Sequence, residues 1–141
     1  MSIEITLRPA RPADLPAILA LDPGSASDLR RSVFIDAALY SGWITVALVD
    51  EAIVGFAATH RHFFSRPFLA LLVVDPAFRR QGVARRLIVQ AIEVRGELWT
   101  STNASNAGAQ ALFAALGFVR AGNIEGFDAN DPELIYRRVD G

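Results

Sequence analysis

The 141-residue sequence contains no cysteine and no lysine. Without cysteine, the chain has no disulfide, no thiolate metal ligand and no cysteine nucleophile. Its 14 basic residues are all arginine and face 15 Asp and Glu residues, which gives a formal net charge of −1. This balance predicts no general attraction to nucleic acid or to an anionic membrane.

Long apolar runs and targeting signals are also missing. The first residues, MSIEITLRPA, do not place an apolar segment after a basic one, and no apolar run in the sequence approaches the ~20 residues of a membrane span. We therefore expect a cytoplasmic protein with no membrane partner. A length of 141 residues predicts a single domain, residues 1–141, built around one core.

The most informative stretch is LALLVVDPAFRRQGVARRLIV, residues 69–89. Its apolar start predicts a strand buried on both faces, which Asp75-Pro76 ends because proline has no N–H to donate. Apolar spacing from Ala84 to Val94 predicts a helix. A basic turn that contains glycine, residues 79–82, connects the two elements.

Strand, basic glycine turn and helix together are typical of an anion site. The first turn of a helix has unpaired N–H groups and a partial positive charge, and Gly82 lacks the Cβ that would keep a phosphate away from the backbone. The alternative is a glycine near a helix start by chance, since such a motif is short. The P-loop and G-x-G-x-x-G nucleotide motifs are absent. The turn predicts a phosphate or pyrophosphate ligand.

Two spaced motifs resemble the GNAT superfamily of acyl-coenzyme A-dependent N-acyltransferases. Arg79-x-x-Gly82-x-Ala84 is similar to the family's pyrophosphate motif [QR]-x-x-G-x-[GA]. The block N-x-x-A-x-x-L-F-x-x-x-G-F, from Asn106 to Phe118, is similar to the family's second motif. The resemblance implies acetyl-coenzyme A (acetyl-CoA) as the cofactor.

The remaining patterns predict a single-domain α/β fold with the order β-α-α-β-β-β-α-β-α-β-β. The resemblance implies a central mixed, mostly antiparallel sheet flanked by helices. Strands are expected at residues 3–7, 43–49, 52–59 with a continuation to 63, 69–74, 97–102, from 118 onward and at 133–139, and helices from residue 12, at 28–40, 84–94 and 105–116.

The resemblance implies a pantetheine arm that pairs with backbone groups of the central strand, and a pyrophosphate on the basic turn. An amide near the start of the second motif can bind the same cofactor, although Asn103 is equally a helix cap. The expected cofactor-binding residues are Leu72, Val73, Val74, Arg79, Arg80, Gln81, Gly82, Val83, Ala84, Arg85, Asn103 and Asn106.

The implied reaction is direct attack of an amine on the thioester, and the sequence departs from the family in two places. Phe113 stands where relatives commonly have a tyrosine that protonates the departing thiolate, and residues 68–72 carry no carboxylate to act as base. His60 and His62, two apart on one strand face, are the catalytic candidates. The alternatives are a bound water as base and two surface histidines at a strand end.

The acceptor site is indicated by an acidic segment with one aromatic residue, residues 124–133. It can attract a cationic amine, and the alternative is a solvated loop. The expected substrate-binding residues are Phe34, Glu125, Phe127 and Asp128, and no metal site is expected. In the resembled fold, the two helices between the first and second strands also border the acceptor.

These observations predict an N-acetyltransferase that modifies a primary amine of a small molecule or peptide. The alternative is a catalytically silent acyl-CoA-binding sensor or regulatory module, which the missing tyrosine favours. A nucleotide-binding domain is disfavoured because the P-loop is absent. A homodimer is one option that the resemblance raises.

Overall fold

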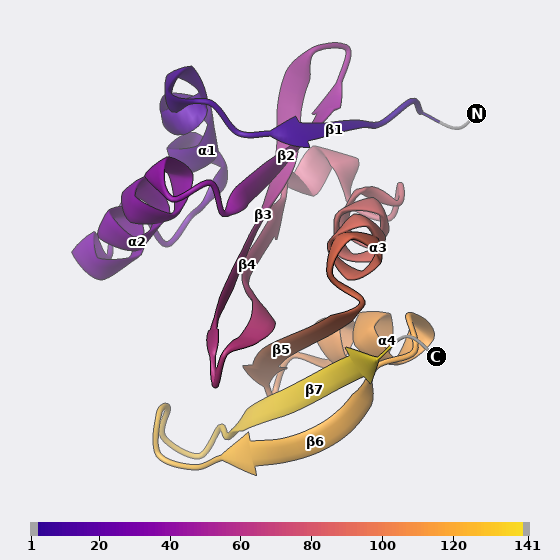
Figure 1. The fold of residues 1–141 in the computed structure, drawn as a ribbon. Coiled ribbons are helices and arrows are strands. Elements are labelled where there is room, and N and C mark those ends of the chain that lie inside the picture. Colours follow the sequence, from indigo (N-terminus) through magenta and orange to yellow (C-terminus); the bar gives the residue numbers. More distant parts are fainter. Residues whose placement is uncertain (1–2, 140–141) are drawn as a thin grey trace. The chain divides into compact units, whose positions relative to one another are not determined.

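A computed structural model describes residues 3–139 and shows a mixed α/β chain (Figure 1). Two short 3-10 helices, Pro12–Asp14 and Pro76–Phe78, precede α1 and follow β4. The elements are β1 (Thr6–Pro9), α1 (Leu15–Leu21), α2 (Leu29–Tyr40), β2 (Ile44–Val49), β3 (Ala52–Phe63), β4 (Arg66–Val74), α3 (Val83–Arg95), β5 (Glu97–Asn103), α4 (Ala107–Ala115), β6 (Val119–Ile124) and β7 (Glu133–Val139).

Within residues 3–139, the strands form one seven-stranded sheet in the order β1-β2-β3-β4-β5-β7-β6. The pairing of β4 with β5 is parallel, whereas β1 with β2, β2 with β3, β5 with β7 and β6 with β7 are antiparallel. The predicted element order and the mixed, mostly antiparallel sheet are therefore confirmed.

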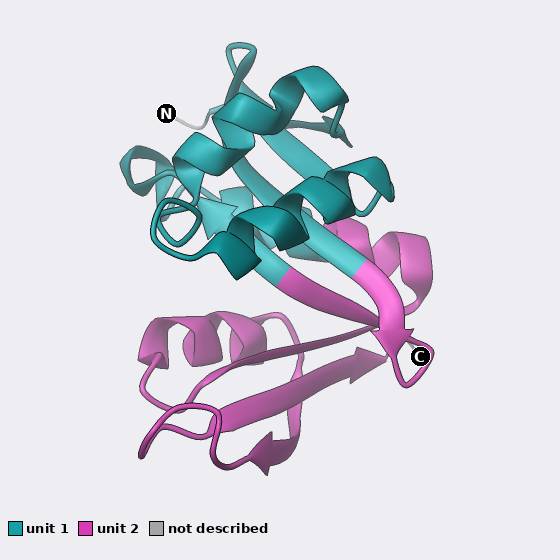
Figure 2. Cartoon of the chain, turned by 90° about the vertical axis from the view of Figure 1, so that its left-hand side faces the viewer, with its two compact units in different colours: residues 1–59, 71–88 teal, residues 60–70, 89–141 magenta. Residues whose placement is uncertain are grey.

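Two compact units can be distinguished along the chain (Figure 2). The first comprises residues 1–59 and 71–88, and the second comprises residues 60–70 and 89–141. In the first unit, buried apolar side chains of α1 and α2 pack with those of β2 and β3, and the centre of this core includes Ile18, Ile35, Val46 and Phe56. Because neighbouring residues of a strand face opposite sides, Gly55 points away from that core, toward α3.

The second unit has its own core on one face of β5 and β7. Leu98, Thr100, Leu134 and Tyr136 are buried, and Phe113 of α4 lies with its ring centroid 5.4 Å from that of Tyr136. Gly117 follows α4 with φ +86, a left-handed conformation that favours glycine at the end of a helix. Gly117 is the glycine of the second motif, one residue before Phe118.

Local signals set several element ends. Asp28 caps α2 by accepting a hydrogen bond from the Arg30 N–H, and Asp75 caps the 3-10 helix after β4 through the Ala77 N–H. The first strand begins at Thr6, not at residue 3, since its pairing with β2 starts at Thr6↔Leu48. The expected continuation of the third strand to residue 63 is confirmed.

The prediction that the central strand is buried on both faces is wrong for its second half. Leu69 is buried, but residues 71–74 are only half-buried. The physical reason lies in the pairing: the β4–β5 ladder has two pairs, Phe68↔Trp99 and Leu69↔Thr100, although β4 runs on to Val74.

Among the described helices, residues 3–139, none has the length and apolar character to span a membrane.

Candidate functional site

The turn before α3 has a backbone shaped by its sequence. Arg79 is extended, Arg80 adopts φ +62, and Gly82 adopts φ +88. A positive φ is unfavourable for a side chain as large as arginine, and such strain tends to occur at functional turns. The Arg86 N–H then donates to the Gly82 carbonyl over 3.0 Å, so Gly82 opens the helix.

The first turn of α3 is suited to bind an anion. The N–H groups that follow Gly82, those of Val83, Ala84 and Arg85, precede the first intrahelical bond and carry the positive end of the helix dipole. A Cβ built on Gly82 would meet no protein atom within 4 Å, so protein packing does not require this glycine. The positive φ of Gly82 is what favours glycine at this position. The open space beside its backbone is available to a ligand.

Positive charge surrounds this turn. Arg79, Arg80, Arg85 and Arg86 are all exposed, and the guanidinium group is a planar donor that matches phosphate oxygens. The nearby carboxylate of Asp75 has another partner: it accepts a hydrogen bond from the Ala77 N–H over 2.9 Å. The turn therefore combines backbone donors with side-chain cations.

Gly55 of β3 packs against the start of α3, next to the site, and the sequence alone did not indicate it. A Cβ on Gly55 would lie 3.0 Å from the Val73 carbonyl oxygen and 3.0 Å from Val83 Cγ1. The absence of that Cβ lets the start of α3 approach β3 and β4 closely. A glycine inside a strand pattern is the signal that could have indicated this contact.

The strand that leads into the turn has backbone groups in a suitable position. Beyond the two pairs with β5, at Phe68 and Leu69, β4 continues through Leu72, Val73 and Val74. An extended ligand arm can pair with N–H and C=O groups of such a strand. The predicted cofactor-binding residues between positions 72 and 85 thus all belong to the first unit.

The two predicted amides belong to the second unit and have other contacts there. Asn106, not Asn103, caps α4: its Oδ1 accepts the Ala109 N–H over 3.1 Å. The alternative that Asn103 is a helix cap is wrong, because its side chain faces the β6–β7 connection and donates to Asp128 Oδ2 over 2.9 Å. It also donates to the Asp131 carbonyl over 3.3 Å.

Phe113 is a core residue. It is 4% exposed, and its ring contacts Tyr136 and Phe118 with centroid distances of 5.4 Å each. The aromatic ring is thus kept for packing, and this position brings no hydroxyl group.

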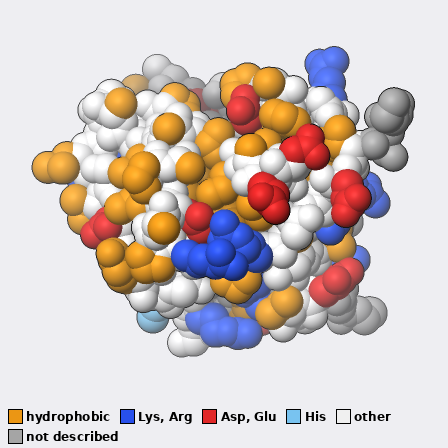
Figure 3. All heavy atoms as spheres, turned by 90° about the horizontal axis from the view of Figure 1, so that it is seen from above, with side chains coloured by type: hydrophobic (Ala, Val, Ile, Leu, Met, Phe, Trp, Pro, Cys, Tyr) orange, Lys and Arg blue, Asp and Glu red, His pale blue; other side chains and the backbone are white. Residues whose placement is uncertain are grey.

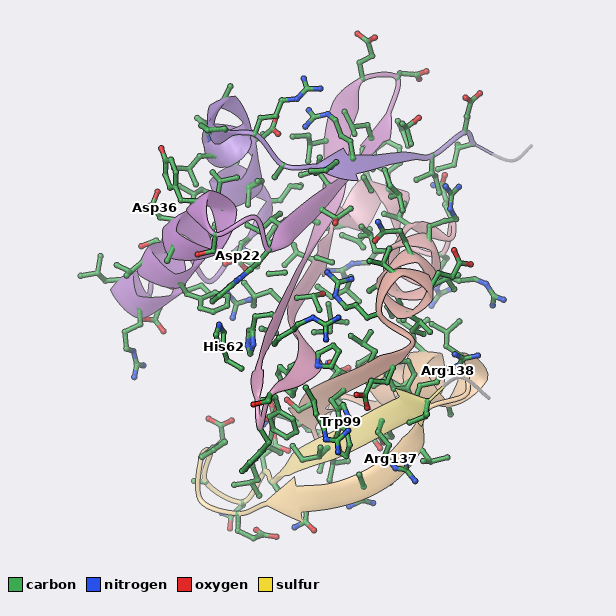
Figure 4. The ribbon with its side chains drawn as sticks, viewed as in Figure 1. Asp22, Asp36, His62, Trp99, Arg137 and Arg138 are labelled. Atoms are coloured by element: carbon green, nitrogen blue, oxygen red, sulfur yellow. The ribbon has the colours of Figure 1, made fainter. Side chains whose placement is uncertain are left out.

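The two histidines lie at the end of β3 in the second unit. Their ring centroids are 5.6 Å apart, and His60 Nδ1 accepts the backbone N–H of His62 over 3.0 Å. Burial lowers the pKa of His60, and the nearby His62 lowers it further. His62 is exposed and projects from β3 (Figure 4).

The predicted acceptor residues are spread over both units. Glu125, Phe127 and Asp128 lie on the exposed β6–β7 connection, where the Phe127 side chain is 69% exposed. Asp131 fastens this connection to the start of α4 by accepting from Ser105 N over 2.9 Å and from Ser105 Oγ over 2.7 Å. Phe34 is half-buried against the core of the first unit.

Comparison with known proteins agrees with this geometry. Residues 13–118 match the acetyltransferase (GNAT) family. This match covers most of the chain, and the chain belongs to that family, whose cofactor is acetyl-CoA. The family prediction is therefore confirmed, together with its fold and cofactor.

Individual relatives show how far the likeness extends. A GNAT-family acetyltransferase of Bacillus cereus ATCC 10987 superimposes with a TM-score of 0.90 at 30% identity, over 98% of this chain and 99% of that one. The Escherichia coli ribosomal-protein-S18-alanine N-acetyltransferase has the same fold, with a TM-score of 0.80 at 21% identity over 98% and 96% of the chains. The [ribosomal protein bS18]-alanine N-acetyltransferase of Salmonella typhimurium is 38% identical over 77 residues, 51% of each chain. The chain spans about half the length of this curated relative.

Proposed function

We propose that this chain is an acetyl-CoA-dependent N-acetyltransferase that acts on the α-amine of a peptide or protein. The observation that carries the proposal is the turn before α3. Arg80 and Gly82 adopt positive φ there, and the turn and the start of α3 carry four exposed arginines. Acetyl-CoA supplies the thioester carbonyl that the amine attacks. The turn would hold its pyrophosphate, and the backbone of residues 72–74 would pair with the pantetheine arm.

The choice of an α-amine follows from the groups that the chain lacks. A lysine-type amine, with a pKa near ~10.4, is free base in only about one molecule in a few thousand at pH 7. A peptide α-amine, with a pKa of about 8, is free base in roughly one molecule in ten. Because residues 68–72 carry no carboxylate, the α-amine is the acceptor that makes the smaller demand on a base.

Relatives support the same acceptor class. The relative from Salmonella typhimurium is named for a ribosomal-protein alanine, and a Xenopus laevis protein that is 36% identical over 84 residues is an N-alpha-acetyltransferase. This chain covers 31% of that second protein.

We assign proton acceptance to His62, with His60 beside it. The lone pair of His60 Nδ1 accepts the His62 N–H, and burial lowers the pKa of His60, which favours its neutral form. On the acceptor side, Glu125 and Asp128 would attract the ammonium form and Phe127 would cover it, while Phe34 supports the first unit. Asn103 would act on this side as well, through its bond to Asp128.

A silent acyl-CoA-binding module is the second candidate. The observation in its favour is Phe113, a buried ring where relatives commonly have a phenol that acts as acid. A thiol with a pKa of roughly 8.5 leaves as thiolate near neutral pH, so loss of that acid slows the reaction without preventing it.

The decisive assay follows thiol release from acetyl-CoA with two matched peptides. One has a free N-terminal alanine and no lysine, and the other has a blocked N-terminus and one lysine. Release with the first peptide, and acetylation at its α-amine by mass spectrometry, supports the proposal. Release with the lysine peptide alone refutes the α-amine, and CoA binding without any release supports the silent module.

A matched pair of variants tests the anion site. Gly82→Trp and Gly42→Trp both replace a glycine at positive φ, +88 and +75, with no protein atom within 4 Å of the added Cβ. Both therefore introduce similar backbone strain. We expect Gly82→Trp to weaken CoA binding by about tenfold or more, as the loss of a charge-assisted hydrogen bond predicts, and Gly42→Trp to leave it unchanged. Equal affinities in the two folded variants would reject the pyrophosphate assignment.

A further inference from the structure

The first unit contains a polar groove that the proposed reaction does not use. It has a volume of about 460 Å³ and is lined by Thr6, Arg8, Arg11, Leu48, Asp50 and Glu51. Thr6 of β1 and Leu48 of β2 lie directly opposite in the strand register, so they are adjacent in its lining. A volume of this size accommodates a small molecule, and four charged residues in the lining disfavour an apolar one.

The positively charged side of the groove is rigidly built. Arg8 holds Asp14 with two hydrogen bonds, Nη1 to Oδ2 at 2.7 Å and Nη2 to Oδ1 at 3.1 Å. Asp14 Oδ2 also accepts the backbone N–H of Arg11 over 2.7 Å, which fixes the segment that carries the Arg11 side chain. Arg8 thus forms an ion pair with Asp14, whereas Arg11 forms none among the described residues; the Arg11 side chain is exposed at the groove and close enough to Asp14 to help lower the pKa of that carboxyl.

The negatively charged side is the turn between β2 and β3. Asp50 and Glu51 form a two-residue hairpin with φ +50 and +67, a turn in which asparagine and glycine are preferred. Two carboxylates therefore occupy backbone positions that disfavour them. Figure 3 views the molecule from the top of Figure 1 and shows basic and acidic side chains close to one another on this face.

The opposite charges share one groove without pairing. None of the ion pairs within residues 3–139 includes Arg11, Asp50 or Glu51. The groove thus presents one cation and two carboxylates that form no ion pair with one another. A ligand that carries both charges can bridge them.

We propose that this groove binds a small zwitterion of the amino-acid class, with its carboxylate at Arg11 and its ammonium group at Asp50 and Glu51. A ligand with one charge would be attracted by the groups of one sign and repelled by those of the other. Exposed ion pairs are individually weak, so the affinity of such a site is roughly millimolar. This site does not depend on the proposed transferase activity.

The test is an NMR titration of the full ¹⁵N-labelled chain that follows the amide signals of Thr6, Leu48 and Asp50. Glycine, 4-aminobutyrate and diglycine serve as probes with different charge separations, at up to about 50 mM and constant ionic strength. Acetate and methylammonium are the matched ligands with one charge. We expect saturable shifts with at least one zwitterion, and at least about fivefold weaker binding of both single-charge ligands. The preferred probe distinguishes a free amino acid from a peptide with two charged ends.

Three variants complete the test. Arg11→Gln and Glu51→Gln should each weaken zwitterion binding by about threefold to tenfold, because each removes one of the three charges that face the ligand. Arg30→Gln is the control, since the Arg30 side chain is 93% exposed and lies outside the groove. Absence of saturable shifts, equal binding of acetate, or equal affinity in all three variants would overturn the proposal.

Discussion

Gly55→Ala tests whether the close approach of α3 to the sheet builds the anion site. The new Cβ would lie 3.0 Å from the Val73 carbonyl oxygen and from Val83 Cγ1, about 0.4 Å inside the 3.4 Å at which ordinary contact begins. Val73 O is backbone, and Val83 is only 1% exposed, so neither group can move freely. Overpacking of this kind costs about 1–3 kcal/mol, and the alanine recovers about 0.4–1 kcal/mol through the unfolded chain.

We therefore expect Gly55→Ala to lower the free energy of unfolding by about 1–2 kcal/mol, or Tm by roughly 3–7 °C. It should also weaken CoA binding, because the start of α3 is displaced. Urea unfolding followed by circular dichroism and a calorimetric CoA titration measure the two effects.

Gly108→Ala is the control for this experiment. An added Cβ at Gly108 meets only Asn106 Oδ1, at 3.8 Å, and the position lies inside α4. This variant should be more stable than the original chain, by at most about 0.5–1 kcal/mol because Gly108 is in the first turn of α4, since glycine destabilises a helix relative to alanine. A stabilised Gly55→Ala variant, or one with unchanged CoA affinity, would refute the reasoning.

Three further predictions concern titration and capping. The hydrogen bond from Arg8 holds the pKa of Asp14 below its ordinary value, so this pair stabilises the folded state above pH ~3.9 and loses its effect as pH falls through the folded-state pKa. Asp14→Asn should therefore be less stable at pH 7, with a gap in urea midpoints that closes at acid pH; a constant gap would contradict this. The pKa of His60 is lowered by burial and then by its histidine neighbour, so the unfolded chain binds this proton more readily and stability should fall as pH drops below ~6.5. His60→Gln should reduce that fall between pH ~7.5 and ~5.5, and an identical pH dependence would argue against it. Asn106→Ala should lose about 1 kcal/mol of stability, whereas Asn106→Asp should retain both the cap of α4 and the CoA affinity, and weaker CoA binding by Asn106→Asp would assign the amide to the cofactor.

The strand, turn and helix of residues 66–95 could be predicted because each signal is local. Apolar runs, Asp75-Pro76 and Gly82 act on the backbone within a few residues of themselves. The same holds for α4, whose apolar spacing and Gly117 indicate its face and its end. These two blocks are the ones that resemble the family, so fold and cofactor followed from them.

Contacts between distant segments required the structure. The sequence does not indicate that Gly55 lies against Val73 and Val83. The register between β3, β4 and α3 results from packing of the whole unit. The roles of the two amides were similarly undetermined, since Asn103 finds its partner 25 residues away in Asp128. The same is true of the groove between β1 and the β2–β3 turn.

By itself, then, the amino-acid sequence predicted an anion site at residues 79–82, because the charge of this turn, its glycine and the helix that follows are contiguous. Only the tertiary structure decided that Phe113 serves the core, that Asn106 serves the helix, and that His60 accepts a hydrogen bond from its neighbour. The physical reason is the same in each case: a side chain takes the role that its spatial neighbours leave to it, and those neighbours are set by the packing of the fold.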